Sequence, residues 1–110
     1  MTTPLEAFDT LDLRVGRIIH AEPHPAARKP SYKLRVDFGP LGVKSSSAQL
    51  THLYQPSDLQ GRLVVAAVNL GTRNIAGFPS EVLVLGLPDD GNRVVLLAVE
   101  REVPLGGKVF

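Results

Sequence analysis

The stretch RNIAGFPSEVLVLG, from Arg73 to Gly86, combines two local patterns that decide how the chain is built. Its first half contains Gly77 and Pro79, which interrupt helices and central strands, so we predict a loop there. Its second half, Val82 to Leu85, is apolar at every position, whereas a strand with one solvated face alternates apolar and polar residues. The sequence therefore predicts a strand that is covered on both faces.

Outward from this stretch, the chain divides into short strands separated by turns. Thr3 and Pro4 predict a short N-terminal helix ending near Leu11, because threonine caps helices and proline is tolerated in the first turn. Residues Asp89 to Asn92 are a strong hairpin signal. The other predicted elements are strands at Leu13–Ala21, Tyr32–Phe38, Val43–Ala48, Arg62–Asn69, Glu81–Leu87 and Arg93–Glu100, and a short helix or turn within Thr51–Gly61.

Five or six short strands with little helix predict an all-β protein, either a small closed barrel or a sandwich. The five-stranded Greek-key barrel called the oligonucleotide/oligosaccharide-binding (OB) fold fits the chain, and we treat residues 1–110 as one domain of this kind.

The composition limits the classes of function. The net charge of +1 argues against binding nucleic acid by bulk charge alone. Aromatic residues make up only 5% of the chain, which disfavours a surface that stacks single-stranded bases. The chain has no cysteine, no secretory signal pattern and no apolar run of the roughly 20 residues that cross a bilayer. We expect a soluble, cytoplasmic protein.

The predicted strands are of two kinds. Tyr32–Phe38 alternates, but the last three strands are apolar on both faces. A small barrel buries only the inward set, so the outward set forms a contiguous apolar wall, which usually marks an interaction surface. A symmetric homodimer is the commonest way to cover such a wall. The alternative is that the two terminal segments cover it within one chain.

No catalytic pattern stands out. The three histidines, His20, His24 and His52, lack metal-ligand spacing. Ser45–Ser47 has no nucleophile elbow, and Gly106-Gly107-Lys108 lacks the rest of a phosphate loop. We therefore predict a protein that is not an enzyme and holds no cofactor and no metal.

Basic residues remain as candidates for binding. Lys33 and Arg35 share the outward face of one strand, which in an OB barrel belongs to the usual ligand surface. Basic side chains on a strand also prevent its edge from pairing with other chains, so this second explanation stays open.

Several segments resemble the tRNA-binding domain family. Asp12 to Ile18 (DLRVGRI) is similar to the opening strand of that family, and Asn69 to Ser80 (NLGTRNIAGFPS) is similar to its second signature. Within the family, the resemblance extends to the CsaA-type export chaperones. It is carried there by Ala27–Leu34 (ARKPSYKL), Ser46–Thr51 (SSAQLT), Ile75–Gly86 (IAGFPSEVLVLG) and Val103–Gly106 (VPLG).

The resemblance implies a homodimeric OB barrel with extra C-terminal strands at the dimer interface. It also implies a chaperone that binds unfolded polypeptides and export precursors and is linked to the secretion motor SecA. The alternative is a structure-specific tRNA-binding protein, and the two activities can coexist on one dimer. The predicted peptide-binding residues are Ile75, Phe78, Pro79, Leu50 and Tyr54. The predicted RNA-binding residues are Lys33, Arg35, Lys44, Ser46, Asn69, Arg73 and Ser80.

Two positions depart from the tRNA-binding pattern that the resemblance supplies. Thr72 stands where proline usually precedes the arginine, and Glu81 follows Ser80 where glutamine is usual. An acidic residue beside a phosphate-facing loop opposes RNA binding. These departures therefore bear on tRNA binding more than on the fold.

Overall fold

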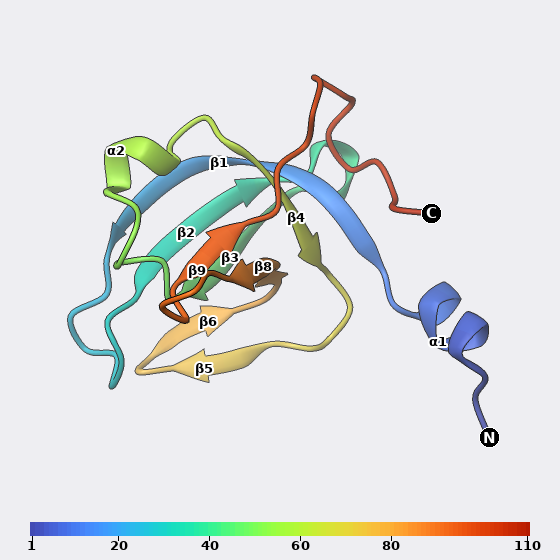
Figure 1. The fold of residues 1–110 in the computed structure, drawn as a ribbon, viewed down its shortest axis with the longest axis horizontal. Coiled ribbons are helices and arrows are strands. Elements are labelled where there is room, and N and C mark those ends of the chain that lie inside the picture. Colours follow the sequence, from blue (N-terminus) through green and yellow to red (C-terminus); the bar gives the residue numbers. More distant parts are fainter.

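The structure is built on short strands, with small helices at its margins (Figure 1). It is a computed structural model that describes all residues from Met1 to Phe110. The helical elements are α1 (Pro4–Thr10), a 3-10 helix (Gly39–Leu41) and α2 (Pro56–Leu59). The strands are β1 (Leu13–Pro23), β2 (Tyr32–Asp37), β3 (Val43–Ala48), β4 (Leu63–Ala67), β5 (Arg73–Ile75), β6 (Phe78–Ser80), β7 (Leu83–Val84), β8 (Gly86–Pro88) and β9 (Val94–Leu96).

The main sheet has the strand order β3-β2-β1-β4-β7, and all of its pairs are antiparallel. Strand β1 is long and bent: its first half pairs with β4 and its second half with β2. Gly16 lies at the bend, where a Cβ atom would stand 2.6 Å from Val36 Cγ1 and 2.7 Å from the Phe38 ring. Only glycine allows β1 to bend this closely over Val36 of the neighbouring strand β2 and over the Phe38 ring.

The barrel closes through the serine run. Ser45 O accepts from the backbone N–H of Glu81 at 2.8 Å, and the Ser46 hydroxyl donates to Val82 O at 2.8 Å. Ser47 N–H donates to the Ser80 hydroxyl at 2.9 Å. These bonds join β3 to the segment that leads into β7, so the two edge strands of the sheet meet.

The core fills the interior of this barrel. Ile18, Leu34, Val36, Phe38 and Val64 are completely buried. Leu59 of α2 is also completely buried and belongs to the same cluster, so the helix covers one end of the barrel. The all-β OB barrel predicted from the sequence is confirmed.

Most predicted elements are confirmed, but three differ. The stretch expected to be a loop before Ser80 is a hairpin of β5 and β6. The strand expected at Glu81–Leu87 is broken into β7 and β8, because Leu85 N–H bonds to Val65 O while Leu85 O accepts from Leu97. Strand β9 ends at Leu96, earlier than expected.

The two ends of the chain behave differently. Helix α1 has the predicted threonine cap, with Glu6 N–H bonded to Thr3 Oγ1 at 3.1 Å, but it extends away from the barrel and has no buried residue (Figure 1). The C-terminal segment instead lies along β1, where Val109 N–H bonds to Leu13 O at 2.9 Å. None of the helices has the length and apolar character needed to span a membrane.

Candidate functional site

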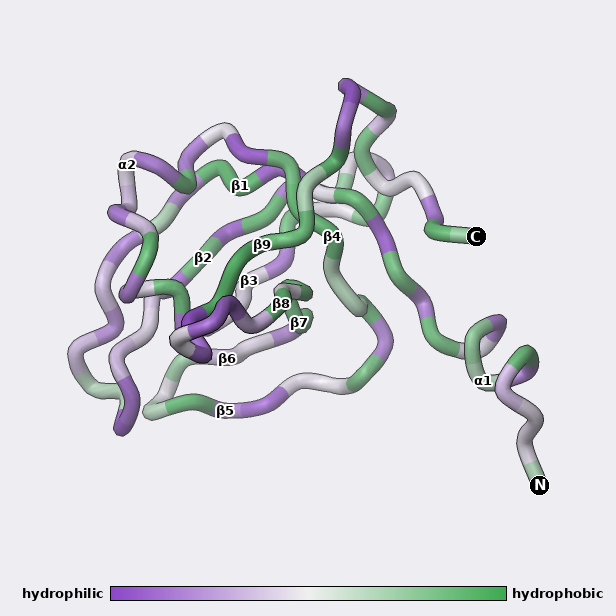
Figure 2. Tube along the Cα trace, viewed as in Figure 1, coloured by the Kyte–Doolittle hydropathy of each residue, from purple (hydrophilic) through white to green (hydrophobic).

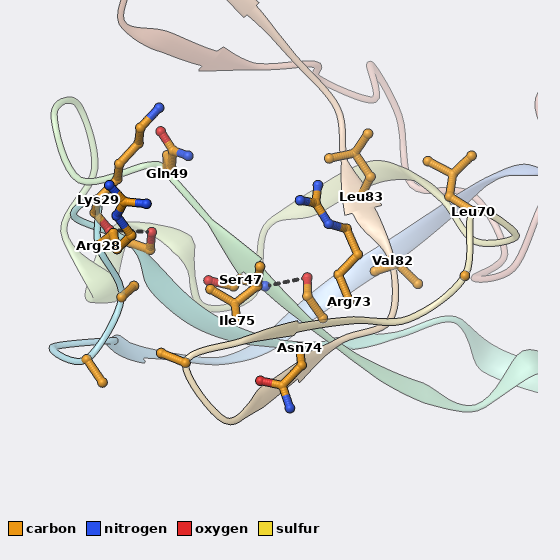
Figure 3. Close-up of a pocket in the computed structure, with 16 residues that line it drawn as sticks. Arg28, Lys29, Ser47, Gln49, Leu70, Arg73, Asn74, Ile75, Val82 and Leu83 are labelled. Carbon is orange, nitrogen blue, oxygen red and sulfur yellow. Dashed lines mark hydrogen bonds between the residues drawn. The ribbon is translucent and has the colours of Figure 1, made fainter.

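A groove of about 890 Å³ opens beside the closed edge of the barrel (Figure 3). Its walls come from the loop between β1 and β2, the end of β3, the chain around β5, and the start of β7. It is lined by Ala26, Ala27, Arg28, Lys29, Ser31, Ser47, Gln49, Leu70, Gly71, Arg73, Asn74, Ile75, Ala76, Ser80, Val82 and Leu83. We call it the groove below.

The charged residues of the groove are all cationic. Arg28 and Lys29 extend from the loop between β1 and β2, and Arg73 extends from β5 on the other side (Figure 3). None of the three forms an ion pair within the chain, and no aspartate or glutamate lines the groove. The groove therefore has a local positive field, although the whole chain has a charge of only +1.

The groove also contains aliphatic side chains. Leu70 and Leu83 are 56% and 53% exposed, which is high for leucine, and Ile75 and Val82 also line the groove. No aromatic residue lines the groove. The surface thus offers apolar contact and positive charge together, without a ring on which a base could stack.

The β5–β6 hairpin holds one wall in place. Its two turn residues, Ala76 and Gly77, have φ angles of 50° and 85°, which is the backbone of a tight hairpin turn. The Asn74 side chain accepts a bond from Gly77 N–H at 2.7 Å across that turn. The Ser45 hydroxyl donates to Pro79 O at 2.6 Å, which fixes the hairpin to β3.

His24 holds the opposite wall. Its backbone N–H bonds to Ser31 O at 3.0 Å and closes the loop that carries Arg28 and Lys29. Its ring is only 3% exposed and packs edge-on against Phe78 at 5.6 Å, while its Nε2 atom has no hydrogen-bond partner.

The structure divides the predicted peptide-binding residues. Ile75 lines the groove, and Pro79 lies exposed in the adjacent hairpin. Phe78 lies on the outside of the barrel, with Lys33 Nζ 5.5 Å from its ring centre, and is not part of the barrel core. Leu50 is 3% exposed and lies in the core, and Tyr54 uses its hydroxyl to accept from Leu96 N–H. Leu50 and Tyr54 are therefore left out of the site.

The predicted RNA-binding residues are likewise separated. Arg73 and Ser80 line the groove, and Arg35 is exposed on the outer face of β2 as expected. Lys44 pairs with Val36, which places it on the core side of the sheet at the strand end. Ser46 is 1% exposed and occupied with barrel closure, so its side chain cannot reach a ligand.

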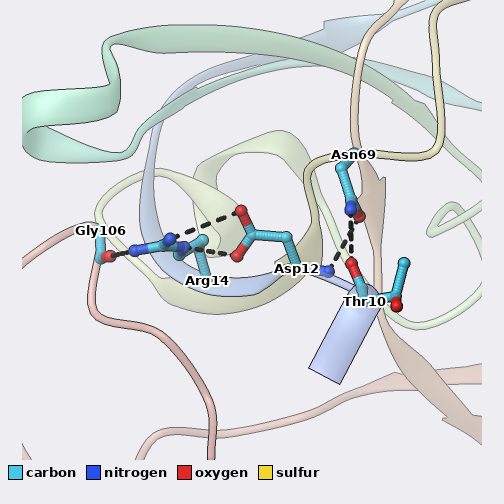
Figure 4. Close-up of polar contacts among 5 residues, drawn as sticks. All are labelled: Thr10, Asp12, Arg14, Asn69 and Gly106. Atoms are coloured by element: carbon cyan, nitrogen blue, oxygen red, sulfur yellow. Dashed lines mark hydrogen bonds and ion pairs between the residues drawn. The ribbon is translucent and has the colours of Figure 1, made fainter. Parts of the chain in front are cut away.

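Asn69 stands in a structural network near α1 (Figure 4). Its amide donates to Thr10 O at 2.8 Å and accepts from Asp12 N–H at 2.9 Å, so both polar atoms are engaged. Arg14 in turn pairs with Asp12 at 2.6 Å and donates to Gly106 O at 3.0 Å. This network fixes the junction between α1 and β1.

Three groove residues, Arg28, Lys29 and Leu70, were not among the site residues expected from the sequence. A basic pair in a loop bounded by Pro25 and Pro30 was the available signal, because such loops are exposed and carry binding residues. The sequence could not show that this loop faces β5, which is more than 40 residues away along the chain.

Comparison with known proteins places this geometry in context. Residues 13–108 match the profile of a family described as "Putative tRNA binding domain". The chain is 41% identical over 109 residues to methionine–tRNA ligase of Pyrococcus abyssi, but it spans only 15% of that enzyme. Among solved structures, it is similar over its full length to the chaperone CsaA of Bacillus anthracis, with 50% identity and a TM-score of 0.90.

A second solved structure, the CsaA chaperone protein of Picrophilus torridus, has 40% identity and a TM-score of 0.91, again over the full length of both chains. The prediction of a non-enzymatic protein agrees with these full-length matches to chaperones, since the ligases match only over a small part of their length. The chain belongs to the tRNA-binding domain family and shares the fold of its CsaA chaperones from end to end.

Proposed function

We propose that the protein is a chaperone that binds unfolded polypeptides, among them export precursors, in the groove. The observation that carries this proposal is the pairing of exposed aliphatic side chains, Leu70 and Leu83, with a tightly held wall on each side. Exposed apolar surface in a concave site is the form in which unfolded segments are bound. Binding alone keeps an unfolded client from aggregating.

The proposal includes a homodimer acting in the cytoplasm, with SecA as the partner that receives export precursors. Support for the dimer comes from the outward apolar wall, where Leu87 and Val95 form an exposed cross-strand pair. Neither terminal segment covers this pair, because α1 extends outward and the C-terminal segment lies along β1.

The second candidate function is tRNA binding. The observations that favour it are Arg73 in the groove and a second pair of cations, Lys33 and Arg35, on the outer face of β2. Duplex RNA is bound largely by shape and through phosphates, so such cations suffice without base stacking. Binding of this kind weakens linearly with salt on a logarithmic scale.

Aggregation of an unfolded export precursor, followed by light scattering, tests the first function. The wild-type chain at stoichiometric amounts is expected to suppress aggregation. The double variant Leu70→Ser and Ile75→Ser is expected to fail even at about tenfold excess, since two buried aliphatic side chains contribute about 3–6 kcal/mol, which is more than about a hundredfold in affinity. Leu41→Ser is the matched control, because Leu41 is 41% exposed on the 3-10 helix outside the groove.

The same preparations are then tested for retention of total tRNA at low and moderate salt. The chaperone function is supported if the wild type and Leu41→Ser suppress aggregation of the precursor and the double variant does not. Retention of tRNA at moderate salt without any suppression of aggregation would replace the chaperone with the RNA-binding function.

A further inference from the structure

We propose that the groove selects polypeptide segments in which a carboxylate side chain lies beside apolar side chains. This inference rests on the proposed chaperone function and specifies its substrate class. It concerns the charge of the client, which neither the fold nor the family assignment determines.

The charge of the groove favours an anionic client. Arg28, Lys29 and Arg73 line it and form no ion pair within the chain, and no acidic residue lines it. Arg14, Arg17, Arg93 and Arg101 lie outside the groove, and each forms an ion pair with a carboxylate of the chain. The cations of the groove are thus among those that remain available to an external anion, and they are the ones that lie beside exposed aliphatic side chains.

Cations also flank the aliphatic surface of the groove. Arg28 and Lys29 stand on one side, Arg73 on the other, and Ile75 lies between them (Figure 3). An extended segment that places an apolar residue on Ile75 therefore has cations on both sides of it. A carboxylate next to that apolar residue in the client can reach a guanidinium or an ammonium group, whereas a cationic residue meets like charge.

The lining of the groove fits an acidic, apolar peptide better than it fits RNA. The groove has no aromatic side chain on which a base could stack. A hydrated sugar–phosphate chain would also leave the aliphatic surface of the groove in contact with water. That surface is formed by Leu70, Ile75, Val82 and Leu83. Apolar side chains of a peptide bury that surface, and its carboxylates satisfy the cations. The lining as a whole therefore matches an acidic, apolar peptide more closely than a nucleic acid.

The test uses three labelled peptides with identical apolar residues, flanked by glutamate, glutamine or lysine, and measures their affinity by fluorescence anisotropy. The glutamate peptide is expected to bind about tenfold more tightly than the glutamine peptide, with the lysine peptide weakest, and the difference should shrink as salt rises. Arg73→Glu should reverse the order of the glutamate and lysine peptides. Arg101→Glu is the matched control, because Arg101 is an 85% exposed arginine outside the groove.

The outcomes separate this inference from the chaperone function. Equal affinity for the three peptides, or a preference for lysine, overturns charge selection while leaving the chaperone function in place. A preference for glutamate that Arg73→Glu leaves unchanged also overturns it, because the groove would not be the source. If no peptide binds, no aggregation is suppressed and tRNA is retained, both proposals fail and the cations serve RNA.

Discussion

Glu81 has a structural role that its residue type alone does not reveal. Its carboxylate accepts a hydrogen bond from the Ser45 N–H at 3.0 Å and shares the single proton of the Ser45 hydroxyl with Pro79 O, at 2.9 and 2.6 Å from the hydroxyl oxygen. Glu81 so joins β3 to the chain that leads into β7. These bonds, the backbone one above all, hold the pKa of Glu81 below its ordinary value of 4.5, with Lys44 and Arg35 adding to the effect. Glu81, the residue expected to oppose RNA binding, therefore also helps to hold the barrel closed.

Glu81→Gln is therefore expected to lower the free energy of unfolding by about 1 kcal/mol at pH 7, since hydrogen bonds to a charged group are lost. Because the pKa of Glu81 is depressed in the folded state, its contribution is present above the ordinary value of 4.5 and is lost as pH falls through the folded value. Denaturant unfolding from pH 7 to acid measures this. The difference between the two proteins should shrink below pH 4.5 and vanish once the pH lies below the lowered pKa of Glu81. A constant difference at every pH would contradict this mechanism.

At the scale of elements, the β5–β6 hairpin is the clearest difference from the sequence-based expectation. Gly77 and Pro79 were interpreted as signs of a loop, yet Pro79 lies in a two-stranded ribbon opposite Asn74. Proline is compatible with such a ribbon, because an edge strand leaves some N–H groups unpaired. The turn itself requires left-handed backbone at two successive residues, and Ala76 adopts it at φ 50° without the freedom of glycine.

Ala76→Asn is expected to raise the free energy of unfolding by about 1 kcal/mol, because asparagine tolerates left-handed backbone better than alanine. Calorimetry should show an increase in Tm of about 4 °C or more. Asn92 supplies the reverse control: it already holds φ 61° in the turn between β8 and β9, so Asn92→Ala should lower Tm. A fall in Tm for Ala76→Asn would show that the turn is not strained.

At the scale of the whole molecule, the outward apolar wall is the main feature that the chain leaves unexplained by itself. Leu87 and Val95 are 57% and 36% exposed, and β9 is hydrophobic along its length (Figure 2). Clustered apolar side chains of this kind are unfavourable in water unless another surface covers them. A second copy of the chain is the occupant we propose.

Replacing Leu87 and Val95 with lysine should convert a dimer into a monomer, because like charges would face each other across a two-fold axis. Light scattering coupled to size exclusion, at micromolar concentration, measures the mass. Leu41→Lys is the control, since Leu41 is similarly exposed, at 41%, on the 3-10 helix. A molar mass of one chain for the wild type under these conditions would contradict the proposed dimer.

Local sequence determined the elements of this protein and the class of its fold. Alternation in Tyr32–Phe38, the threonine cap of α1 and the turn at Asp89–Asn92 each depend on neighbouring residues, and the structure confirms all three. Patterns of this range are set by backbone geometry and by which face of an element is apolar. The apolar character of both faces of the last strands likewise followed from the order of residues, although the break between β7 and β8 did not.

Only the tertiary structure decided which residues form the groove and which hold the barrel together. Arg28 and Arg73 are brought to one groove by barrel closure, and Ser46, Asn69 and Tyr54 prove to be engaged in internal hydrogen bonds. The sequence gives the same signal for a polar side chain that binds a ligand and for one that forms a hydrogen bond with a distant backbone group. Its partner is fixed by contacts between strands far apart in the chain, and such contacts leave no periodic signal.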